Sequence, residues 1–132
     1  MIEFTVPLTP VSKKNSQQIY VNRATGRPFI TPSQKYKEYE KSALWFIPKV
    51  NKPIDRPCNV KMLFYMPTKR KCDLVNMQES ILDVMVKSGL LADDNYSIVY
   101  SMDGSRVLVD RENPRTEVTI TLMEEINNES NA

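Results

Sequence analysis

The sequence predicts one small α+β domain, with two main helices packed on a mixed β-sheet in the order β-hairpin, helix, strand, helix, strand, strand. Two observations predict it: several short segments alternate apolar and polar residues as strands do, and two longer segments repeat apolar residues at helical spacing. The 132 residues, 41% hydrophobic and 26% charged, suffice for one compact core. We expect the domain to span residues 1–124, and residues 125–132 to form a disordered C-terminal tail.

The N-terminal segment predicts a strand followed by a hairpin. Residues 2–6 alternate apolar and polar side chains, which is typical of a half-buried strand. Residues 19–21 and 29–30 flank a short polar segment in which Gly26 supplies a positive φ. The two flanking segments are therefore expected to pair as the arms of the hairpin.

A first helix is expected after this hairpin. Thr31 is predicted to cap it, with Pro32 in the first turn and Gln34 completing a capping box. Pro48 is predicted to end the element, because proline cannot donate the next helical hydrogen bond. The apolar residues that repeat at helical spacing are Tyr36, Tyr39, Ala43 and Phe46.

The central part predicts a strand and the clearest helix of the chain. Residues 60–66 alternate as a strand, and the helix is expected over residues 74–88, with Asp73 as N-cap and Gly89 as the stop. The side chains predicted to face the core are Leu74, Met77, Ile81, Leu82 and Met85, and those predicted to face solvent are Asn76, Glu79, Ser80, Asp83 and Lys87.

The C-terminal part predicts the remaining strands. Residues 96–102 alternate as a third strand, and residues 106–109 are expected either to pair with it or to extend it. Residues 103–106 are expected to form a tight turn, and residues 118–122 form the last predicted strand.

Several absences narrow the chemistry. The chain has no histidine, which excludes histidine-based triads and histidine-ligated zinc, and only three glycines, too few for a phosphate-binding glycine-rich loop. Cys58 and Cys72 are expected to be free thiols of a cytoplasmic protein, since no signal peptide or membrane-spanning apolar run is evident. No small-molecule organic cofactor is expected. Carboxylates, lysines or a hard metal ion must therefore carry any catalysis.

Charge is distributed unevenly along the sequence. Residues 1–72 carry a net charge of +10 and residues 73–132 carry −8, which together give the overall +2. A basic half joined to an acidic half suits a protein that attracts a polyanion and also concentrates carboxylates around a cation. Folding that mixes both halves over one surface explains the same numbers equally well.

The most informative stretch combines a basic turn, Lys69-Arg70-Lys71, with carboxylates that follow it. The carboxylates are Asp73 at a helix start, Glu79 and Asp83 along that helix, and Asp93-Asp94 just beyond it. Phosphodiester hydrolysis needs such a set, because a hard cation takes oxygen ligands and the scissile phosphate must be neutralised. We expect Asp94 to fold back near the helix.

These residues resemble the RusA family of Holliday junction resolvases. That family carries a basic turn, then Asp-Leu-Asp-Asn, a helix with a lysine, a further aspartate and an Asp-Asp pair. The matching string is Arg70-Lys71-Cys72-Asp73-Leu74-Val75-Asn76-Met77-Gln78-Glu79, followed by Asp83 and Asp93-Asp94. The resemblance implies a RusA-like endonuclease domain over residues 1–124. It also implies a homodimer that binds four-way DNA junctions and nicks two strands symmetrically with Mg²⁺, with Mn²⁺ as a substitute, in recombination and repair.

The resemblance makes Asp73 and Asp94 the matched metal-binding aspartates, with two departures. Val75 stands where the family has a second essential aspartate, and Glu79 stands where it has a catalytic lysine. Because Glu79 lies one helical turn after Val75, its longer side chain can reach toward nearly the same point. Our hypothesis is a catalytic and metal-binding cluster of Asp73, Glu79 and Asp94, with Asp83 and Asp93 as further metal ligands.

Each carboxylate also has a purely structural interpretation. Taken alone, Asp73 is best explained as a helix N-cap, whereas the motif around it favours metal binding. Asp83 is expected to pair with Lys87 on a solvated face. Glu79 fits that solvated face as well as it fits a metal site. Asp93 and Asp94 also suit a turn with Asn95.

Several basic and aromatic residues are candidates for contact with DNA. The predicted contacts to the DNA backbone are Lys13, Lys14, Arg23, Arg27, Lys35, Lys69, Arg70 and Lys71. Tyr20, Tyr36 and Tyr39 suit stacking on unpaired bases, although helix-spaced tyrosines belong more often to a core. The competing functions are a module of the same fold that binds branched DNA without cutting it, an enzyme acting on other branched nucleic acids, and an interaction protein without any role on nucleic acids.

Overall fold

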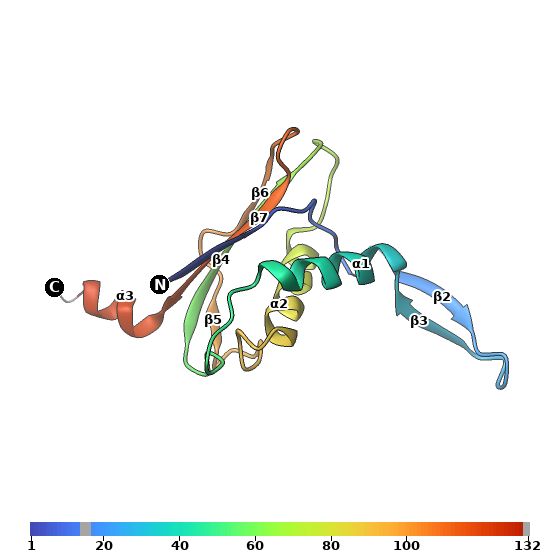
Figure 1. Cartoon of the computed structure of the whole chain (residues 1–132), viewed down its shortest axis with the longest axis horizontal. Helices are drawn as coiled ribbons and strands as arrows, with labels where there is room; N and C mark the ends of the chain where they lie inside the picture. Colours follow the sequence, from blue (N-terminus) through green and yellow to red (C-terminus); the bar gives the residue numbers. More distant parts are fainter. Residues whose placement is uncertain (14–16, 131–132) are drawn as a thin grey trace.

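The computed structural model describes residues 1–13 and 17–130 and has the α+β architecture that the sequence predicts, with two main helices (Figure 1). Five strands form one mixed sheet and two form a separate hairpin. The elements are β1 (Ile2–Val6), β2 (Gln17–Val21), β3 (Pro28–Pro32), α1 (Gln34–Ala43), the 3₁₀ helix η2 (Leu44–Phe46), β4 (Cys58–Met66), α2 (Leu74–Lys87), β5 (Val99–Ser101), β6 (Arg106–Val109), β7 (Arg115–Leu122) and α3 (Met123–Ser130). Among the described residues, no helix has the length and apolar character that crossing a bilayer requires.

The centre of the sheet is the antiparallel pair of β4 and β7. Ile120 of β7 lies opposite Val60 of β4 on one side and opposite Ile2 of β1 on the other. Along β4 the side chains alternate between buried and half-buried positions, as they must when one face of a sheet is covered. The predicted strand over residues 60–66 is therefore confirmed, and its inward side chains include Met62 and Phe64.

The outer edge beside β4 is an interrupted strand. Both β5 and β6 pair parallel to β4, so residues 106–109 extend the strand before them, which was one of the two predicted outcomes. The side-chain amide of Asn59 holds the interruption, donating to the Asp103 carbonyl at 3.2 Å and accepting from the Asp103 N–H at 2.8 Å. Gly104 has φ +88°, as the predicted tight turn requires.

The third predicted strand is shorter than expected. It was predicted over residues 96–102, whereas β5 begins only at Val99. The reason is local. The side-chain oxygen of Asn95 accepts hydrogen bonds from the Ser97 N–H and hydroxyl, and the backbone carbonyl of Asn95 accepts from the Ile98 N–H at 3.0 Å. These bonds form a turn before the strand, in place of strand pairing.

Helix α1 begins two residues later than the sequence predicts. Ser33, and not Thr31, is the N-cap, and its hydroxyl accepts from the Tyr36 N–H at 3.2 Å. Thr31 instead belongs to β3, where it lies opposite Gln18. Tyr36 and Tyr39 are buried in the core, which supports their structural interpretation over base stacking.

The end of α1 departs from the predicted pattern. After Ala43 the helix tightens into η2, and Ile47 is extended, as expected for a residue before proline. This change turns Phe46 outward to 41% exposure and buries Ile47 in its place. Phe46 was predicted on the buried face, so that prediction is wrong.

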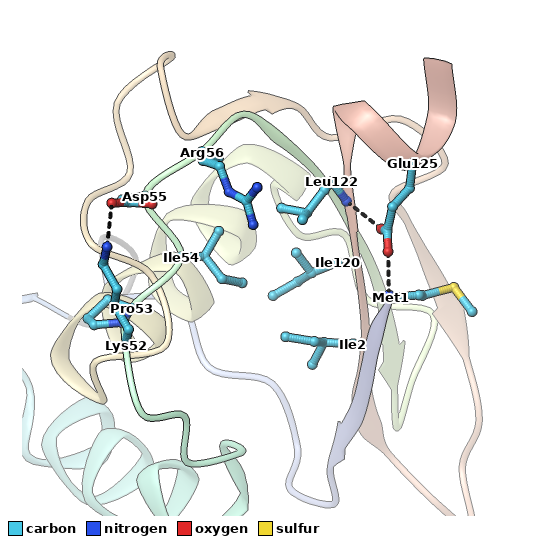
Figure 2. Close-up of a pocket in the computed structure, with 10 residues that line it drawn as sticks. All are labelled: Met1, Ile2, Lys52, Pro53, Ile54, Asp55, Arg56, Ile120, Leu122 and Glu125. Carbon is cyan, nitrogen blue, oxygen red and sulfur yellow. Dashed lines mark hydrogen bonds and ion pairs between the residues drawn. The ribbon is translucent and has the colours of Figure 1, made fainter. Parts of the chain in front are cut away.

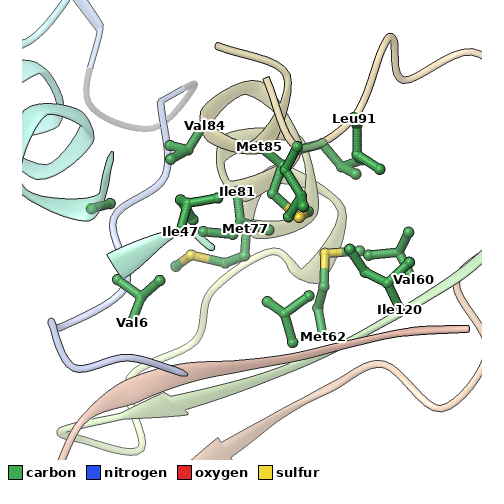
Figure 3. Packing of buried hydrophobic residues seen from close by; sticks show 14 of the residues in the cluster. Val6, Ile47, Val60, Met62, Met77, Ile81, Val84, Met85, Leu91 and Ile120 are labelled. Carbon is green, nitrogen blue, oxygen red and sulfur yellow. The ribbon is translucent and has the colours of Figure 1, made fainter. Parts of the chain in front are cut away.

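Helix α2 packs on the sheet and supplies much of the core. Asp73 caps it and Gly89, at φ +84°, follows its end, as predicted. Figure 3 shows Met77, Ile81 and Met85 of this helix gathered beside inward side chains of β4 and β7.

The face of α2 that was predicted to be solvated is partly buried. Asn76 and Ser80 are both buried, because the N-terminal loop and α1 cover this side. The Ser80 hydroxyl accepts from the Lys13 N–H at 2.8 Å and donates to the Asn76 carbonyl at 3.1 Å. The Tyr36 hydroxyl reaches the Ser80 carbonyl at 3.5 Å.

The hairpin β2–β3 is confirmed as an antiparallel pair and projects beyond one end of α1, away from the five-stranded sheet (Figure 1). Its turn is organised by Asn22, whose side chain accepts from the Ala24 N–H at 2.9 Å, and by Gly26 at φ +70°. The exposed Arg23 and Arg27 lie in this turn.

The C-terminal segment differs from the expected disordered tail, because residues 123–130 form α3. Glu125 holds its start, accepting from the Leu122 N–H at 2.9 Å and from the N-terminal ammonium of Met1 at 3.0 Å. This contact ties both ends of the described chain together. Residues 131–132 of the expected tail lie outside the described residues.

These contacts border a hollow of about 400 Å³ at this end of the sheet (Figure 2). In this apolar hollow, as we name it, Ile2, Ile54 and Ile120 point inward, and four charged side chains form its rim: Lys52, Asp55, Arg56 and Glu125. Its rim charges are partnered within the chain, for example Lys52 with Asp55 at 3.7 Å. The two cations and two carboxylates of this rim are therefore all compensated, which leaves no excess charge here to bind a phosphate or a metal ion.

We expect Ile81→Ala to lower the free energy of unfolding by about 2–5 kcal/mol, because Ile81 is fully buried between helix and sheet. Val75→Ala on the same helix is the matched control. With Val75 57% exposed, it should change stability by less than about 0.5 kcal/mol. Urea unfolding followed by circular dichroism measures both, and equal losses would contradict the assigned packing.

Candidate functional site

The N-terminal end of α2 carries Asp73, which the structure confirms as the helix N-cap. Its Oδ1 accepts from the Val75 N–H at 3.0 Å, and the residue is exposed. A carboxylate in this position also compensates the positive end of the helix dipole. The structural interpretation of Asp73 therefore holds, and its exposure leaves it accessible to a cation or to solvent.

The segment after α2 sets the position of Asp93 and Asp94. Leu90 and Leu91 are buried directly after the positive-φ Gly89. The backbone of Ile54 pairs with the residues on either side of Leu91, donating to the Leu90 carbonyl and accepting from the Ala92 N–H, each at 2.9 Å. This short bridge anchors the chain immediately before the two aspartates.

Asp94 lies at the C-terminal end of α2, in an acidic hollow of about 290 Å³. The residues that line the acidic hollow are Lys13, Asp83, Val86, Lys87, Asp93 and Asp94. Lys13 from the N-terminal loop supplies the only ion pair recorded for Asp83 among the described residues, with Nζ 3.4 Å from Oδ2. The predicted pairing of Asp83 with Lys87 is wrong, because Lys87 binds Glu40 of α1 at 2.7 Å.

Hydrogen bonds, burial and neighbouring charges shift the pKa values of Asp93 and Asp94 in opposite directions. Hydrogen bonds from the Asp94 N–H, at 2.7 Å, and from the Asn95 amide lower the pKa of Asp93. Burial raises the pKa of Asp94, and the neighbouring carboxylates Asp93 and Asp83 raise it further. A cation bound here would relieve this repulsion, which is what a carboxylate site for a hard metal requires.

The structure does not gather the predicted catalytic residues around one point. Asp73 caps the start of α2, whereas Asp94 is grouped with Asp83, ten residues further along the helix. At a rise of 1.5 Å per residue, the two ends of this segment are on the order of 15 Å apart. Glu79 lies between them, exposed and one turn before Asp83. Among residues 1–13 and 17–130, no three carboxylate or thiol side chains are close enough to hold one metal ion.

A second, basic hollow of about 350 Å³ lies at the opposite end of α2. Arg70 and Lys71 of the predicted basic turn line it together with Lys35 of α1, and Cys72 and Met77 contribute its wall at the helix start. Three cationic side chains around one hollow suit a phosphate group of a nucleic-acid backbone.

The other predicted DNA contacts are distributed differently. Lys69 is exposed on the same basic turn, and Arg23 and Arg27 are exposed at the tip of the hairpin. Lys13 is held by Asp83 and lies over the Tyr36 ring at 5.9 Å, so the structure places it inside the acidic hollow. Lys14 and the Tyr20 side chain fall outside the described part of the chain.

Sequence reasoning missed the pairing of Lys13 with Asp83 and that of Lys87 with Glu40. Each joins residues far apart in sequence, so no local spacing indicates either. Both cysteines are free, as expected.

Two comparisons relate the chain to known proteins. The family model described as Endodeoxyribonuclease RusA matches residues 7–121. The crossover junction endodeoxyribonuclease RusA of Aquifex aeolicus (strain VF5) is 32% identical over 96 residues, a match that covers 71% of this chain and 72% of that protein. The family match encloses α2, the acidic hollow and the basic hollow, and it confirms the predicted resemblance.

We expect Asp93→Asn to lower the pKa of Asp94 toward its ordinary value of 3.8, because the substitution removes a neighbouring negative charge. Burial remains, so the return should be incomplete. Asp103→Asn, at an exposed position in the turn between β5 and β6, is the control and should leave the pKa of Asp94 unchanged. An NMR titration of the carboxyl carbons measures the pKa of Asp94 in both variants. An unchanged pKa of Asp94 in Asp93→Asn would show that the two carboxylates are not coupled.

Proposed function

We propose that this chain, which belongs to the RusA family of endodeoxyribonucleases, hydrolyses phosphodiester bonds at Holliday junctions and related branched DNA. The proposal includes dependence on Mg²⁺ or Mn²⁺, and a cytoplasmic role in DNA recombination and repair. The observation that supports it is the pairing of two opposite hollows along one helix: carboxylates at the C-terminal end of α2 and cations at its N-terminal end. Hydrolysis of a phosphodiester uses both chemistries.

The acidic hollow fits a divalent cation by its donor chemistry. Its potential ligands, from Asp83, Asp93 and Asp94, are all carboxylate oxygens, the donor type that Mg²⁺ prefers. Mg²⁺ commonly uses one or two carboxylates and takes its remaining ligands from water and substrate phosphates, so a three-residue cage is not required. When bound, the cation supplies Lewis-acid charge to the scissile phosphate.

The residues of this chain would divide the remaining work. Arg70, Lys71 and Lys35 would hold a backbone phosphate in the basic hollow and so orient the strand. Asp94 would take part as an ionised ligand, because a bound cation would offset the burial and the neighbouring carboxylates that raise its pKa. Lys13, now paired with Asp83, would be free to bind phosphate once a cation replaces it.

We propose further that Asp73 and Asp94 meet only between two copies of the chain. Symmetric cutting of a four-way junction needs two active sites, which a homodimer provides. Within one chain, Asp73 caps the start of α2, whereas Asp94 lies beside Asp83 in the acidic hollow, so a shared ion would need Asp73 from one copy and Asp94 from the other. We retain Glu79 as a third ligand on the exposed face between them.

One observation favours a second candidate function, binding of branched DNA without cleavage. Val75, 57% exposed, presents an apolar side chain where the family carries an aspartate. A chain with this change retains the basic turn and the exposed Arg23 and Arg27 of the hairpin, which would hold DNA. Cleavage of a labelled junction distinguishes the two functions directly.

We expect the chain to cleave a labelled four-way junction only with Mg²⁺ or Mn²⁺. Asp94→Asn should slow the reaction by about two orders of magnitude, because a metal ligand contributes several kcal/mol to the transition state. Glu79→Gln should slow it equally if Glu79 takes the place of the family aspartate. Gel electrophoresis of the denatured products measures each rate.

Asp55→Asn, an exposed aspartate on the rim of the apolar hollow, is the matched control and should cleave at the wild-type rate. If the chain binds the junction but does not cleave it with either metal ion, the nuclease function is rejected in favour of DNA binding without cleavage. A near-normal rate for Glu79→Gln would remove that residue from the site.

We expect a mixture of Asp73→Asn and Asp94→Asn chains to recover nicking that neither variant has alone. In a mixed dimer, one site combines both substitutions, and the other combines the two intact aspartates, so one strand is cut. The two variants are co-refolded and then assayed on a junction labelled on one strand at a time. An inactive mixture of confirmed mixed dimers would show that each site lies within a single chain.

A further inference from the structure

The most exposed large apolar side chain of the first helical segment is Trp45, which is 84% accessible in η2. Its neighbours Leu44 and Phe46 are 36% and 41% exposed. Ala43 and Ile47, on either side of these three residues, are buried and anchor the turn. The exposure of Trp45 is therefore imposed by the fold, and a fixed exposed apolar surface usually marks an interaction site.

The surroundings of Trp45 are basic. It lines a hollow of about 500 Å³ with three lysines, Lys41, Lys49 and Lys87. Neither Lys41 nor Lys49 forms an ion pair with any side chain that the structure describes, whereas Lys87 is paired with Glu40. The stacking hollow, as we name this surface, thus combines an indole with uncompensated positive charge.

We propose that the stacking hollow binds an unpaired nucleotide of branched DNA, with its base stacked on Trp45 and its flanking phosphates at Lys41 and Lys49. This inference rests on the proposed function. Stacking platforms with adjacent cations are the usual means of holding unpaired nucleic acid, because every base has a π-face and every phosphate is negative. A symmetric contact with a second copy is disfavoured here, since it would bring the lysines of both copies together.

The position of the stacking hollow supports a role beside the cleavage site. Lys87 lines both the stacking hollow and the acidic hollow, so the two surfaces meet at the C-terminal end of α2. A strand whose unpaired base rests on Trp45 would therefore pass its next phosphates toward Asp83 and Asp94. Such a contact would select the unpaired nucleotides at a branch point over continuous duplex.

Trp45 is the only tryptophan of the chain, so its fluorescence reports directly on this surface. The intact protein is titrated, without divalent cation, with a single-stranded oligonucleotide, a four-way junction and a plain duplex. Excitation is set where tyrosine does not absorb. We expect saturable quenching by the first two and weaker quenching by the duplex.

Trp45→Ala should weaken binding of single strands by on the order of tenfold, and Trp45→Phe should retain most of the affinity. Lys41→Gln and Lys49→Gln should each reduce the salt slope of binding by about one. The matched control is Tyr100→Ala, which removes another exposed aromatic side chain, on β5, and should leave both quenching and affinity unchanged.

The anisotropy of a labelled junction, measured in the same titrations, separates the two proposals. A junction that binds with unchanged Trp45 emission and with equal affinity for Trp45→Ala would overturn the stacking hollow and leave the proposed function intact. Absence of any DNA binding would overturn both. A shift in emission that depends on protein concentration in the absence of DNA would assign the surface to a second copy of the chain instead.

Discussion

The enclosure of α2 is the constraint on which the rest of the structure depends. One side of this helix packs on the inward side chains of β4 and β7, and the other is covered by the N-terminal loop and α1 through Ser80. The exposed residues of the helix are Val75, Glu79 and Lys87, with Asp83 half-buried between the last two. Because so much of its circumference is buried, the helix holds its two ends in fixed positions relative to the sheet.

This enclosure converts the uneven charge of the sequence into two separate surfaces. The basic hollow collects Lys35, Arg70 and Lys71 at one end of α2, and the acidic hollow collects carboxylates at the other. The separation is not complete, because Lys13 of the basic half lies among the aspartates of the acidic half. The two interpretations of the charge pattern were therefore each partly right.

The fold was largely predictable because its main signals are local. The alternation of β4, the cap at Asp73 and the glycine at position 89 each act within a few residues, and each was assigned correctly. The errors arise where two local signals compete or a tertiary contact decides. Thr31 and Ser33 are both plausible caps, and only the pairing of residue 31 in β3 selects Ser33.

The candidate site was less predictable because it depends on distance in space. A helix followed closely by Asp93 and Asp94 suggests that these residues return toward Asp73, but the burial of Leu90 and Leu91 keeps them at the far end. Nothing in the local sequence indicates that burial pattern. The shift to a 3₁₀ helix after Ala43 is different, because it accompanies the extended residue before Pro48, which is a local signal.

The interruption between β5 and β6 has a consequence for the behaviour of the protein at high concentration. An exposed sheet edge with a long, regular row of backbone groups recruits strands from other molecules and so promotes aggregation. Here that edge is divided into segments of three and four residues by residues 102–105, where the aliphatic part of Lys61 lies close to the position that a Cβ on Gly104 would take. An incoming strand therefore finds no continuous register along this edge, and the break protects the sheet from edge-to-edge association while leaving the pairing of β4 intact.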